Sequence, residues 1–121
     1  MNLSTKHLQQ LLNKDTKGTQ LSIYLPTHPS SNSQSLAQDT TRLKNALKEI
    51  KSDPGYDERE LGSVVKSPYE LVEDTEFWKH QDRGLAIFAS SDGYEHFHLP
   101  YEITEATYVK NRFVVSPLFI M

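Results

Sequence analysis

LSIYLPTHP, residues 21–29, forms the centre of the expected fold, because an apolar strand ends there at a polar exit. The apolar and aromatic side chains up to Leu25 are typical of an interior strand. Pro26 has no amide hydrogen for a neighbouring strand and predicts the end of this one. Thr27 and His28 follow between two prolines, and we expect them to face solvent in a fixed geometry. This segment indicates a binding place and names no reaction.

Helical patterns lie on both sides of this strand. Ser4 can cap a short amphipathic helix that precedes it, and a second helix is predicted over 36–51. Ser35 and Gln38 have the spacing of a capping box at the start of the second helix. Four of its apolar residues recur at helical spacing, so one stripe should face the core: Leu43, Ala46, Leu47 and Ile50. Lys44, Lys48 and Lys51 then share one flank of the stripe, and Arg42 and Glu49 share the other.

The second half of the chain predicts further helices and most of the sheet. Asp57 should begin a weaker helix, Ser67-Pro68 has the signature of another helix start, and residues 75–78 resemble one more turn. The continuous apolar run at 85–89 predicts a second interior strand. A turn at 91–93 leads into a half-exposed strand at 94–99, and 101–109 with 113–115 supply one or two more.

These elements predict the α/β (α+β) class, with a mixed sheet of about four strands packed against three to four helices in a two- or three-layer sandwich. Residues 1–115 are expected to form one domain. The apolar tail at 116–121 is interpreted as the start of a linker to a following domain, which would cover Leu118, Phe119 and Ile120.

Composition limits the function classes. With 121 residues, 24% charged and 36% hydrophobic, the chain fits one globular domain, and no run approaches the roughly 20 apolar residues of a membrane span. The N-terminus lacks a signal-peptide pattern, so we expect a cytoplasmic protein without membrane contact. The absence of cysteine excludes thiolate catalysis, disulfides and cysteine-based zinc sites. Since the net charge is −3, nucleic-acid binding would need a local basic patch.

Four blocks taken in order, LSIYLPTHP, RLKNALKEIK, EFWKHQDRGLAIFAS and RFVVSPL, resemble the N-terminal domain of the bacterial archaeo-eukaryotic release factor family 3. The resemblance spans roughly residues 21–118. It implies an α/β domain followed by further domains in complete members, and a translation-related, ribosome-associated function. The stop-codon-reading Asn-Ile-Lys-Ser and Tyr-Cys motifs of the archaeal and eukaryotic factors do not occur here, nor does any Gly-Gly pair. The resemblance carries over only the framework at 26–28 and 42–45.

The candidate contact residues to the ribosome or another RNA come from this framework and the following helix: Thr27, His28, Arg42, Lys44, Asn45 and Lys48. Each also has a simpler explanation. Thr27 could cap the loop while His28 partly covers the core. The lysines could form a solvated face and cover apolar surface with their aliphatic stems.

Other polar groups in the sequence are weaker candidates for a site. His96 and His98 point to one face of a strand, but no third metal ligand is evident. Glu73, Asp74 and Glu76 suit a helix start, and Phe77 and Trp78 suit the core better than base stacking. There is no glycine-rich phosphate loop, nucleophile elbow or convincing carboxylate pair, so we expect neither catalysis nor a metal or cofactor.

The leading hypothesis is a non-catalytic recognition domain of a release-factor-like, ribosome- or RNA-associated protein involved in translation. The alternative is a protein-interaction or assembly module with no nucleic-acid contact, in which the apolar tail or an edge strand pairs with the C-terminal domains of the complete protein or with a second copy. A hydrolase built on His28 and His80 is the remotest possibility.

Overall fold

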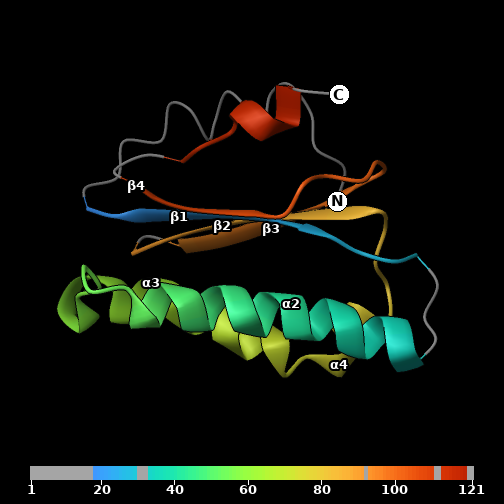
Figure 1. The fold of residues 1–121 in the computed structure, drawn as a ribbon, viewed down its shortest axis with the longest axis horizontal. Helices are drawn as coiled ribbons and strands as arrows, with labels where there is room; N and C mark the ends of the chain where they lie inside the picture. The colour runs from blue at the N-terminus through green and yellow to red at the C-terminus, as the bar shows by residue number, and fades with distance from the viewer. Residues whose placement is uncertain (1–17, 30–32, 92, 111–112, 120–121) are drawn as a thin grey trace.

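The computed structural model describes residues 18–29, 33–91, 93–110 and 113–119. A four-stranded sheet lies between a helical layer on one face and a C-terminal segment on the other (Figure 1). In chain order the elements are β1 (Gln20–Pro26), α2 (Ser33–Ser52), α3 (Glu58–Val72), α4 (Thr75–Trp78), β2 (Gly84–Ser90), β3 (Gly93–Leu99), β4 (Ala106–Lys110) and η1 (Ser116–Phe119). The predicted α+β class is confirmed. The helix expected after Ser4 lies outside the described residues.

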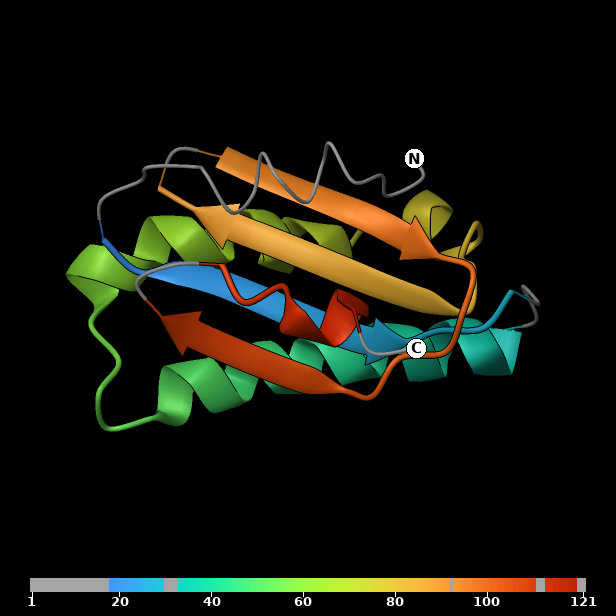
Figure 2. The same ribbon diagram turned by 90° about the horizontal axis from the view of Figure 1, so that it is seen from above.

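The sheet has the strand order β3-β2-β1-β4, which is visible from above in Figure 2. β1 pairs antiparallel with β2 and β4, and β2 pairs antiparallel with β3. The described strands therefore contain no parallel pair of the kind a mixed sheet would have. β1 is central and buried on both faces, as its apolar sequence predicted. β3 and β4 form the two edges.

The core between sheet and helices is mainly aliphatic. Alternate residues of β1, beginning with Leu21 and Ile23, face the helices together with Leu85 and Ile87 of β2. The predicted apolar stripe of α2 packs on them, and Leu43 and Leu47 are fully buried. The helical period was therefore a reliable guide to the inward face. It was a poorer guide to the start of α2, because the helix begins at Ser33 and already contains Ser35.

The predicted helix start at Ser67-Pro68 is wrong. α3 runs unbroken through Pro68, and Asp57 caps its N-terminus by accepting a hydrogen bond from the Arg59 amide. The physical reason is that the buried stripe of α3 includes the Pro68 ring, between Val64 and Leu71 at helical spacing. This burial offsets the hydrogen bond that a proline inside a helix loses.

The opposite face of the sheet carries an aromatic cluster that the C-terminal segment covers. Tyr24 and Phe88 lie in it, with their rings 6.0 Å apart in an edge-on arrangement. The Tyr24 hydroxyl donates to the Val114 carbonyl, so residues 113–115 lie across the sheet instead of forming the expected strand. Leu118 of η1 is only 5% exposed in this cluster. It therefore packs within this domain, whereas the sequence had suggested a following domain as its cover.

Candidate functional site

The polar residue Thr27, which follows β1, is hydrogen-bonded to the loop that precedes β2. The Thr27 amide donates to the Arg83 carbonyl at 3.0 Å, and the Thr27 hydroxyl donates to the Asp82 carbonyl at 2.6 Å. Thr27 is buried as a result. Its hydroxyl hydrogen is thus used within the domain, and the residue holds Arg83 beside the end of β1. This agrees with a loop-capping role more than with a direct ligand contact.

His28 is held by a buried carboxylate. The Asp39 side chain, 1% exposed on α2, accepts from the His28 amide at 3.0 Å and contacts the His28 Nδ1 atom at 2.6 Å. Because a carboxylate only accepts hydrogen bonds, this contact places the ring hydrogen on Nδ1. The side chain of His28 is still 41% exposed. Its Nε2 atom has no hydrogen-bond partner among the described residues and remains available to a ligand.

Two arginines join His28 around a hollow of about 400 Å³. Its walls are residues 26–29, Arg42 of α2, Arg83, and Glu102 from the segment after β3. Within the described part of the chain, Arg42 has one weak ion pair, with Nη1 3.9 Å from the Glu105 carboxylate, and its Nε atom is buried without a hydrogen-bond partner. The lining of the hollow thus combines two full positive charges with one carboxylate, and its imidazole is held by a second carboxylate, Asp39. The arginine N–H groups suit an anionic group, and Nε2 of His28 adds a donor only when the ring is an imidazolium.

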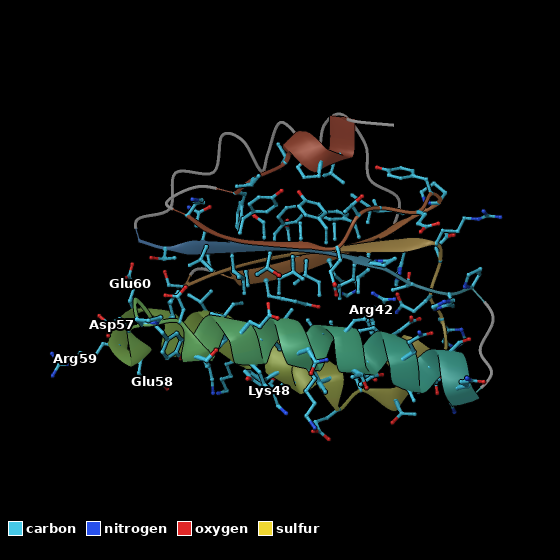
Figure 3. All side chains as sticks on the ribbon, viewed as in Figure 1. Arg42, Lys48, Asp57, Glu58, Arg59 and Glu60 are labelled. Atoms are coloured by element: carbon cyan, nitrogen blue, oxygen red, sulfur yellow. The ribbon has the colours of Figure 1, made fainter. Side chains whose placement is uncertain are left out.

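The structure divides the predicted contact residues into two groups. Thr27, His28 and Arg42 meet at the hollow, whereas Lys44 and Lys48 are exposed on the other flank of α2. Figure 3 shows Arg42 between α2 and the sheet and Lys48 pointing away from the sheet. Asn45 lies near Arg42, beside a second hollow that β4 borders. A ligand in the first hollow would not reach the two lysines.

Asp39 and Arg83 were missed as site residues. Asp39 precedes Leu43 by four residues and therefore lies on the apolar stripe of α2, where a carboxylate needs a partner. A carboxylate at an inward position of the helix was therefore the sequence feature that could have identified Asp39 as a site residue. Arg83 gave no such signal, because only the hydrogen bonds of Thr27 bring its loop to the end of β1.

The histidine row of β3 lies elsewhere in the molecule. His96 and His98 face the helical layer, where the Phe77 ring packs 4.9 Å from His96 and 5.5 Å from His98. Burial lowers the pKa of both imidazoles. Among the described residues no group of three or more histidine or acidic side chains could hold a metal ion.

The remaining candidates have structural partners. Phe77 and Trp78 pack edge-on at 5.0 Å, and Trp78 is buried, which agrees with the core interpretation. Asp74 caps α4, and Glu76 contacts His80 at 3.1 Å. Among the described residues, His28 pairs with Asp39 and His80 with Glu76, so the geometry gives the hydrolase hypothesis no support.

Comparison with known protein families and with curated proteins finds no match for this chain. In the described part of the chain, no helix combines the length and apolar character needed to span a bilayer. The hollow at the end of β1 is therefore the feature from which a function can be argued.

Proposed function

We propose that this chain is a non-catalytic recognition domain of a release-factor-like protein that contacts the ribosome or another structured RNA. The observation that carries the proposal is the convergence of His28, Arg42 and Arg83 on one hollow, although they are far apart in the sequence. The resemblance of four sequence blocks to a translation-related family supports the choice of RNA as the partner.

RNA binding by this acidic chain would depend on a local basic site. The net charge is −3, so the molecule as a whole gains nothing from approaching a phosphate backbone. The hollow offsets this locally through Arg42 and Arg83. Arginines also suit RNA because a guanidinium can bind a phosphate through two parallel hydrogen bonds.

The test is sedimentation of the 121-residue chain with purified ribosomes at low and physiological salt. We expect salt-sensitive co-sedimentation that is lost in the Arg42→Gln/Arg83→Gln variant. Lys44→Gln/Lys48→Gln is the matched control, because it removes the same charge from the exposed flank of α2 and should retain binding. Absence of wild-type binding, or equal loss in both double variants, would overturn the proposal.

A second candidate is the assembly module, and one observation favours it. Val109 is 38% exposed on the edge strand β4, beside a hollow of about 370 Å³ that α2 and Tyr56 also line. Edge strands have unpaired backbone groups that can pair with another chain. Leu118 cannot contribute in this conformation, because it is already buried. Sedimentation of the wild type and Val109→Lys distinguishes the case: assembly through β4 gives a concentration-dependent oligomer that the variant lacks.

A further inference from the structure

The geometry points to a site for a single phosphate group in the hollow at the end of β1, bound by the guanidinium groups of Arg42 and Arg83 and by the Nε2–H of His28 in its imidazolium form, in which both ring nitrogens carry a hydrogen. This inference deepens the proposed function, on which it rests for the RNA source of the phosphate. The same chemistry would also accept a phosphate group from a small nucleotide.

The charges around the hollow favour an anion. Its lining has two arginines and one glutamate, Glu102, and the imidazolium form of His28 balances the Asp39 carboxylate behind it, which leaves one positive charge in excess. Pro26 and Pro29 complete the wall with apolar surface. A single phosphate therefore suits this site better than a neutral group of similar size.

The Nε–H group of Arg42 is available as a hydrogen-bond donor. The Nε atom is buried and has no partner within the described residues, and the one ion pair of the guanidinium, to Glu105, is long at 3.9 Å. An unpaired buried donor is unfavourable, so a ligand that draws the guanidinium into the hollow would remove this cost. The side chain is also 35% exposed, so it can turn.

His28 is oriented before any ligand arrives. Asp39 contacts both the backbone amide and Nδ1, so the ring cannot rotate freely and Nε2 keeps one direction. Thr27 fixes the other side of the hollow through its two hydrogen bonds to residues 82–83. A preorganised site loses less entropy when a ligand binds.

The test is an NMR titration of the full chain with inorganic phosphate. We expect saturable shifts confined to residues 26–29, Arg42 and Arg83. Affinity should fall at least tenfold in Arg42→Gln/Arg83→Gln and less than twofold in Lys44→Gln/Lys48→Gln. Glu102→Gln should instead tighten binding severalfold, because it removes a repulsive charge, and a misfolded variant could not produce that gain.

A second arm identifies the source of the phosphate. The same variants are titrated with adenosine monophosphate and with a single-stranded oligoribonucleotide that has a 5′-hydroxyl end. Tighter binding of the oligonucleotide supports a backbone phosphate, and tighter binding of the monophosphate supports a small nucleotide. Phosphate binding without ribosome binding would overturn only the proposed function. Ribosome binding without saturable phosphate shifts, or shifts unaffected by the arginine and glutamate variants, would overturn the phosphate site.

Discussion

The two histidine regions of this domain use the same side chain in opposite ways. His28, at the end of β1, is partly exposed and paired with the buried carboxylate of Asp39. His96 and His98, on β3, are half-buried against the ring of Phe77, and the Nδ1 atom of His98 has no hydrogen-bond partner among the described residues. The first arrangement fixes a ring and keeps one nitrogen free for a ligand. In the second arrangement the imidazole rings mainly pack against another ring.

The difference shows why polarity alone is a poor marker of a site. A His-x-His pair is the more suggestive sequence pattern, yet its rings face the helical layer with Tyr94, whose buried hydroxyl also has no partner in the described ranges. The isolated His28 is the better candidate because its partner lies on another element. A ligand-binding polar group is one that is oriented by the protein and still accessible.

Of the substitutions that test this difference, Asp39→Ala should lower the stability of the domain most. The variant leaves the His28 amide and ring without their shared acceptor, and we expect the free energy of unfolding to fall by about 2 to 3 kcal/mol. Urea denaturation measures the change. Glu49→Ala, an exposed carboxylate of the same helix, is the control and should change stability by less than about 0.5 kcal/mol. Equal losses in both variants would show that Asp39 has no special role.

Removing the hydroxyls of two buried tyrosines, Tyr94 and Tyr24, should change the stability of the domain in different directions. Tyr94→Phe removes a hydroxyl that has no partner among the residues the structure describes and should leave stability unchanged or raise it by up to roughly 1 kcal/mol. Tyr24→Phe removes the donor to the Val114 carbonyl and should cost about 1 kcal/mol. Denaturation midpoints of the two variants provide the measurement. A clear loss in Tyr94→Phe would mean that its hydroxyl does have a partner in solution.

Lowering the pH should destabilise the domain through the β3 histidines, and this should be the smallest of the predicted stability changes. Burial lowers the pKa of His96 and His98 in the folded state, so as the pH falls below about 7 the unfolded chain binds protons first and stability decreases. Thermal unfolding at pH 7.5 and pH 5.0 measures this loss. It should shrink in His96→Gln/His98→Gln and persist in the exposed control His80→Gln. An unchanged pH dependence in the double variant would contradict this account.

Much of the architecture could be predicted because it depends on local patterns. The apolar run around Ile23 indicated a central strand, and the spacing that begins at Leu43 identified the inward face of α2. The failure at Ser67-Pro68 was of another kind. A valid local start signal lost to the burial of Pro68 within a longer apolar stripe, which no short window of sequence reveals.

The candidate site could be predicted only in part. Thr27, His28 and Arg42 were chosen as contacts, and all three line the hollow. Lys44 was included as part of the framework at 42–45, and the helical period had already placed it on the flank opposite Arg42, where the structure shows it exposed. Proximity along a helix does not place two side chains on one face.

By itself, the sequence determined the α+β class, the central strand and the inward stripe of α2, because hydrophobic periodicity reports which side of each element avoids water. Only the tertiary structure decided the partners of the polar groups. It joined His28 to Asp39 and brought Arg83 to the end of β1. It also folded Leu118 back onto the sheet. These contacts join segments separated by 11 to more than 50 residues, and hydrogen bonding and packing at that range leave little trace in local sequence.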